Sequence, residues 1–150
     1  MKTRKRVRGF SLIEVLFSVF LVVVCASIVA ATMPMATNAR ARADNYNKAL
    51  NLAQKQLESI RGHGYANATP DQMLPDGLID TVTPVATNTY PFTNSDSAAR
   101  DNPARVLQNG TGTVLVEQAD LDLRRVIVTV SWSDRNGNHS VQLGTLIANL

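Results

Sequence analysis

The sequence predicts an α+β protein in which one long N-terminal helix, apolar in its first half, packs on a small antiparallel sheet. Three observations lead to this fold class. No charged residue lies between Glu14 and Arg40. Apolar residues then recur at helical spacing as far as Ile60. Towards the C-terminus, apolar and polar residues alternate with the period of two that is typical of a half-buried strand.

The chain begins with a short basic segment. Five of the fifteen basic residues of the whole chain lie in the first eight positions. The rest of the chain is slightly acidic, although the net charge of the whole chain is +3. The high isoelectric point therefore describes the N-terminal tip and not a basic domain. Because no basic stripe interleaved with aromatic residues follows, no nucleic-acid partner is expected.

The uncharged run over residues 15–39 is long enough to cross a bilayer, which needs about 20 residues. It is also longer than the apolar part of a secretory signal, about 7–15 residues. Eleven Leu, Ile, Val or Phe residues between Val15 and Val29 favour insertion by roughly 3–7 kcal/mol. A carboxylate costs about 2.5–3.5 kcal/mol at mid-bilayer and less at an interface. The segment should therefore insert with Glu14 near the cytoplasmic face, the N-terminus in the cytoplasm and the later residues outside.

The helix is expected over residues 10–61. Leu52 lies off the apolar stripe of its second half and is expected to be exposed or covered by a neighbouring subunit. Pro34 removes a backbone donor and should kink or open the helix, unless it marks the membrane exit. Gly62 and Gly64 should end the helix. The stripe, expected to pack on the sheet, consists of Tyr46, Ala49, Leu50, Ala53, Leu57 and Ile60.

Residues 65–105 contain five of the six prolines and many Thr, Asn, Ser and Asp residues. We expect a long surface loop with one short strand near residues 78–82. Carboxylate oxygens suit calcium, but the spacing of an EF-hand is missing, so solvated turn residues and no metal site are expected. The aspartates concerned are Asp71, Asp76, Asp80, Asp96 and Asp101.

The last third of the chain should form the sheet. Residues 114–116 and 126–132 are expected as strands, with Trp132 in or beside the interface between helix and sheet. Asn136 and Gly137 form a turn signal. The returning strand should place on one face Val141, Leu143 and Ile147.

A short motif joins the basic segment to the apolar run: Gly9-Phe10-Ser11-Leu12-Ile13-Glu14-Val15-Leu16. In this position it closely resembles the processing site of type IV prepilins and of type II secretion pseudopilins. The resemblance implies cleavage after Gly9 by a membrane prepilin peptidase, methylation of the new Phe10 amine, and a role for Glu14 in assembly. It divides the chain into a leader (1–9), a transmembrane or filament-core helix (10–39) and a periplasmic pilin-like domain (40–150).

Further segments narrow the resemblance. Residues 51–61 look like the late N-terminal helix of PilV-type minor pilins and of I-type pseudopilins. Residues 124–134 and 141–148 resemble the closing hairpin of the PilV-like group. Many major pilins have a C-terminal disulfide loop, whereas Cys25 is the only cysteine here and lies in the apolar run. The expected protein is therefore a minor subunit and not a major one.

The sequence thus predicts a minor type IV pilus subunit without a cofactor, acting in assembly, initiation or modification of the pilus. The implied partners are the prepilin peptidase and methylase, other major and minor pilins, and inner-membrane lipid. The protein would be a single-pass inner-membrane protein and then part of a filament. Two alternatives stay open: an I-type pseudopilin of a type II secretion system, and a membrane-anchored binding protein that never polymerises.

An enzyme is not predicted. His63 and His139 lie far apart in the sequence, and Cys25 belongs to the membrane segment. These residues offer neither a Cys/His nucleophile nor a zinc ligand set.

Overall fold

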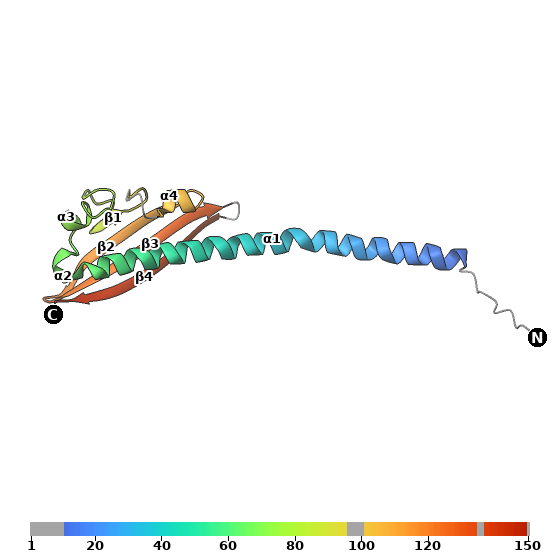
Figure 1. Cartoon of the computed structure of the whole chain (residues 1–150), viewed down its shortest axis with the longest axis horizontal. Helices are drawn as coiled ribbons and strands as arrows, with labels where there is room; N and C mark the ends of the chain where they lie inside the picture. The colour runs from blue at the N-terminus through green and yellow to red at the C-terminus, as the bar shows by residue number, and fades with distance from the viewer. Residues whose placement is uncertain (1–10, 96–100, 135–136, 150) are drawn as a thin grey trace, which may run out of the picture. The chain divides into compact units, whose positions relative to one another are not determined.

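The structure, a computed structural model, describes residues 11–95, 101–134 and 137–149. Gly9 and Phe10, the predicted processing residues, lie outside these ranges. The chain divides into two compact units, Met1–Arg42 and Ala43–Leu150. Helix α1 (Leu12–Gly62) begins in the first unit and ends in the second, where it packs on a four-stranded antiparallel sheet (Figure 1). The predicted α+β class is confirmed.

Helix α1 agrees closely with the prediction. It ends at Gly62, and Gly64, with φ of 75°, adopts the left-handed backbone that favours glycine after a helix. The local opening expected at Pro34 is not found, because α1 continues through this residue. The Thr37 hydroxyl donates to the carbonyl oxygens of Pro34 (3.0 Å) and Met33 (3.3 Å) in the following turn. One missing donor is therefore tolerated without a break in the helix.

The sheet has the strand order β1-β2-β3-β4, and every neighbouring pair is antiparallel. Three strands match the predicted ones, and Val130 of β3 lies between Gly112 of β2 and Val141 of β4. Gly137, with φ of 125°, begins β4, whereas Asn136 of the predicted turn lies outside the described residues. The strands are β1 (Thr89–Pro91), β2 (Thr111–Asp120), β3 (Leu123–Asp134) and β4 (Gly137–Ala148).

One face of the sheet forms the core with α1. The alternation predicted for β3 is confirmed, since Trp132 is 5% exposed and the other inward side chains are fully buried. On β4, Val141 and Ile147 are buried and Leu143 is partly buried against the same core. Trp132 therefore lies on the sheet face that α1 covers. The inward residues of β3 are Val126, Val128, Val130 and Trp132.

The buried face of α1 differs from the predicted stripe. Leu52, expected off the stripe, is only 6% exposed, whereas Tyr46, expected on it, is 51% exposed. The apolar stripe was placed too far to one side because Gln56, a polar residue, belongs to the buried face. A buried set at spacings of three and four residues is one face of a helix. It consists of Ala49, Leu52, Ala53, Gln56 and Ile60.

The segment over residues 65–105 is not the surface loop that was expected. Leu78 and Ile79 are buried but form no strand, and the short edge strand β1 lies later in the chain. The Leu78 amide donates to Met73 (2.9 Å) and the Asp80 amide to Pro91 (2.7 Å), so this backbone bonds to a turn and to a strand end. The apolar side chains of Leu78 and Ile79 therefore indicated burial and not a strand. The described residues in and around this segment also form three short helices: α2 (Gly64–Asn67), α3 (Pro70–Met73) and α4 (Pro103–Val106).

Candidate functional site

The first turn of α1 contains Glu14, the one predicted site residue that the structure describes. The amides of Glu14 (2.9 Å) and Val15 (3.2 Å) donate to the Ser11 carbonyl, and the Glu14 side chain is exposed. A carboxylate in the first helical turn is favoured by the free amides of the helix N-terminus. Among the residues that the structure describes, the Glu14 carboxylate has no cationic partner.

The first half of α1 is apolar and uncovered. By length and composition α1 can cross a membrane, and its most apolar window has no buried residue in the chain by itself. Phe17, Phe20 and Val22 are all more than half exposed. Such a surface is unfavourable in water, which indicates that lipid or other protein covers it.

The few hydroxyl groups of this segment are satisfied within the helix. Ser18 donates to the Glu14 carbonyl (2.7 Å), Ser27 to Val23 (2.8 Å) and Thr32 to Val29 (3.0 Å). Unsatisfied polar groups are costly in hydrocarbon, so these internal bonds make the helix compatible with a bilayer. Cys25, the free cysteine, is exposed on the same segment.

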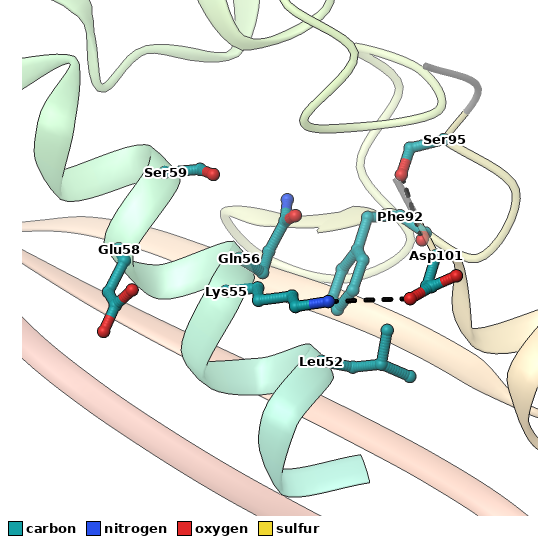
Figure 2. Close-up of a pocket in the computed structure, with 8 residues that line it drawn as sticks. All are labelled: Leu52, Lys55, Gln56, Glu58, Ser59, Phe92, Ser95 and Asp101. Carbon is teal, nitrogen blue, oxygen red and sulfur yellow. Dashed lines mark hydrogen bonds and ion pairs between the residues drawn. The ribbon is translucent and has the colours of Figure 1, made fainter. Parts of the chain in front are cut away.

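The folded unit has a groove between α1 and the segment leading to α4 (Figure 2). It has a volume of about 460 Å³ and includes polar side chains of both elements. Lys55 reaches across it to Asp101, with 3.5 Å between Nζ and Oδ2. Ser95 donates to the Phe92 carbonyl at 3.4 Å on the opposite wall. The ion pair is largely exposed and contributes little stability.

Asp96 lies outside the described residues. The other four aspartates form no metal site within the described ranges, where no three His, Cys, Asp or Glu side chains gather. Asp76 lies 3.0 Å from His63 Nε2, and Asp80 accepts two bonds from the Asn94 amide at 3.1 Å. These carboxylates serve local structure.

The two histidines lie in separate places. His63 has its Nδ1 2.7 Å from the Ser59 carbonyl at the end of α1. His139 stacks on Trp132, with ring centroids 5.5 Å apart, and its Nε2 lies 3.2 Å from Asp134. The structure does not bring the two histidines together in one cluster of metal-binding residues among those that it describes.

The features described so far define a class of protein: an uncovered apolar helix that continues into a small α+β unit, the arrangement of type IV pilin-like proteins. Comparison with known families supports this class. The prokaryotic N-terminal methylation motif matches residues 4–30, which include Gly9, Phe10 and Glu14. No curated protein and no solved structure matches the chain. The chain thus carries a prepilin-type signal, which supports membership of the pilin family and points to a structural subunit.

Proposed function

We propose that this protein is a minor subunit of a type IV pilus. A prepilin peptidase removes residues 1–9, the amine of Phe10 is methylated, and the mature chain waits in the inner membrane with its folded unit in the periplasm. It then enters the filament and acts in assembly, initiation or modification of the pilus. The observation that carries this proposal is the methylation motif at residues 4–30, which leads directly into an uncovered apolar helix.

Opposite charges would allow Phe10 and Glu14 to act together. Glu14 has no cationic partner among the described residues, and a carboxylate transferred into an apolar filament core must be paired. The Phe10 amine stays cationic after methylation and lies just over one helical turn earlier in the sequence. It can serve in the same chain or in a neighbouring one. We favour pairing between subunits, because it sets the axial register as the helix leaves the bilayer.

The minor-subunit role rests on resemblances of residues 51–61 and of the strands that close the sheet. An I-type pseudopilin of a type II secretion system would be processed in the same way. Deletion of the gene separates the two functions: a pilus subunit affects surface filaments, and a pseudopilin affects secretion. A membrane-anchored binding protein that never polymerises would be absent from sheared filaments.

Mass spectrometry of the mature N-terminus tests the proposal. We expect a chain that starts at N-methylated Phe10. Gly9→Val should stay uncleaved because a branched side chain hinders the extended backbone in a protease, whereas Gly9→Ala, the matched control, should still be cleaved. Retention of Met1 or Lys2 in the mature protein would contradict the proposed processing.

A further inference from the structure

Strand β4 is an edge of the sheet, and its own sequence and pairing have none of the features that usually protect an edge, although the four-residue helix α2 contacts this strand. It pairs with β3 over twelve residues without a register shift. It contains neither proline nor Asp, Glu, Lys or Arg. Natural sheets discourage strand addition with short edges, charges, proline or bulges. The opposite edge follows this rule, because β1 has only three residues and ends in Pro91.

The pairing register identifies the backbone groups that face outwards. The Asn149 amide donates to the Asp122 carbonyl at 2.9 Å, and Ala148 lies opposite Leu123 in the adjoining pair. Hydrogen-bonded and non-hydrogen-bonded pairs alternate in an antiparallel ladder. The odd-numbered residues of β4 therefore bond to β3, and the even-numbered ones direct their N–H and C=O away from it. The outward N–H and C=O groups of Gln142, Gly144 and Leu146 form no hydrogen bonds with other described residues.

An apolar flank of α1 lies beside this edge. Helical spacing places Tyr46, Leu50 and Leu57 on one flank. Lys55 and Ser59 lie on the other flank and line the groove near β1. Since β1 and β4 are opposite edges of the sheet, the apolar flank faces β4. In Figure 1, β1 and β4 lie on opposite sides of α1.

The side chains of this flank are only partly covered by the rest of the chain. Tyr46 is 51% exposed, and Leu50 and Leu57 are only partly buried. An added strand beside β4 would cover them with every second side chain, on the face that already includes Val141 and Ile147. We propose that β4, over residues 138–146, binds an extended, uncharged segment of a different protein chain, apolar at alternate positions, as a fifth strand. Backbone hydrogen bonds supply affinity, and the α1 flank selects the apolar side chains.

A second copy of this chain is a poor occupant. Two β4 strands would pair antiparallel about a two-fold axis perpendicular to the sheet. The part of α1 over residues 43–62 would then run in the opposite direction in the partner. Two chains held by their N-termini in one membrane cannot both adopt this arrangement, a step that rests on the proposed membrane anchoring. Pairing of β4 with β1 of another copy would be limited to three residues that end in a proline.

Amide hydrogen exchange of the full-length chain in detergent micelles tests this proposal. The probe is a synthetic peptide of alternating valine and threonine, as long as β4. Its control is the same peptide with alternate amides N-methylated, which cannot complete the ladder. We expect the probe alone to slow exchange of the Gln142, Gly144 and Leu146 amides by about tenfold or more. Exchange at Val141 and Leu143, which bond to β3, should not change.

Two pairs of variants complete the design. Gln142→Pro removes an outward amide without removing a bond to β3 and should abolish protection, whereas Gln142→Ala should keep it. Leu50→Glu places a charge on the apolar flank and should weaken binding, whereas Asn51→Glu adds the same charge to an exposed position on another face. The second pair decides the result if proline unfolds the strand.

Three results would overturn the proposal: outward amides already protected in the free chain, protection that rises with the protein's own concentration, or no protection by the probe. The first means that the chain covers its own edge, and the second means that a second copy is the occupant. None of these outcomes depends on cleavage after Gly9, so failure here is distinguishable from failure of the proposed function.

Discussion

Gln56 of α1 donates from Nε2 to the carbonyl oxygen of Leu78, and both residues are buried. This bond joins the face of α1 that packs on the sheet to the irregular segment that follows α3. The Leu78 side chain belongs to the same core as Ile60 and Val128. A polar residue therefore occupies the apolar face of the helix because it satisfies a carbonyl group that water cannot reach.

The folded unit should be stable without the membrane segment. Its core is made by residues from Ala49 onwards, so a fragment of residues 40–150 should fold by itself. Trp132, the only tryptophan, is 5% exposed and reports on packing through its fluorescence. We expect a blue-shifted emission and one cooperative unfolding transition in urea. A fragment with solvent-like emission in buffer would show that the core requires the first unit.

Gln56→Leu should destabilise this fragment although it replaces a polar residue by an apolar one of similar size. The Leu78 carbonyl loses its donor and stays buried, which costs about 1–3 kcal/mol. The urea midpoint measures the change. The control is Gln54→Leu, an exposed position on the same helix, with an expected change within about 0.5 kcal/mol. Equal midpoints for the two variants would show that water replaces the Gln56 amide.

Gly112→Ala should destabilise the fragment through overpacking. A Cβ at Gly112 would lie 2.5 Å from Cζ of Phe92, closer than van der Waals contact allows. Phe92 is 2% exposed and has little room to move, so we expect a loss of about 1–3 kcal/mol. Gly62→Ala is the matched control because its Cβ would meet no atom within 4 Å. A Gly112→Ala fragment as stable as the Gly62→Ala fragment would show that the ring adjusts.

Glu14→Val separates membrane insertion from assembly. The variant makes the segment more apolar, so insertion and cleavage after Gly9 should be normal. Recruitment into filaments should fall because the proposed partner of the Phe10 amine is lost. Quantitative immunoblots of membrane and sheared-filament fractions measure both steps, with Glu14→Asp as the variant that keeps the charge. Normal recovery of processed Glu14→Val protein in filaments would show that this charge is dispensable.

The extent of helix α1 could be predicted almost entirely from local signals. The charge gap before Arg40, the glycines at positions 62 and 64, and helical spacing each act over a few residues and require no distant partner. The alternation in β3 is equally local, because successive side chains of a strand point to opposite faces of the sheet and only one face is covered. The methylation motif is also a linear signal, so the sequence alone was enough to propose Gly9, Phe10 and Glu14 as site residues.

The tertiary structure decided which residues of the folded unit, Ala43–Leu150, contact one another. Leu52 and Gln56 are buried because Phe92 and the irregular segment around Leu78 lie against that side of α1, and no pattern within the helix indicates this contact. Leu78 and Ile79 have the apolar character of a strand but pack as part of a turn-rich layer. The open edge of β4 likewise follows from strand order, which depends on contacts between residues far apart in the sequence. By itself the sequence determined the long apolar helix, the methylation motif and the strand pattern, whereas only packing over long sequence separations decided the buried helix face and the free edge.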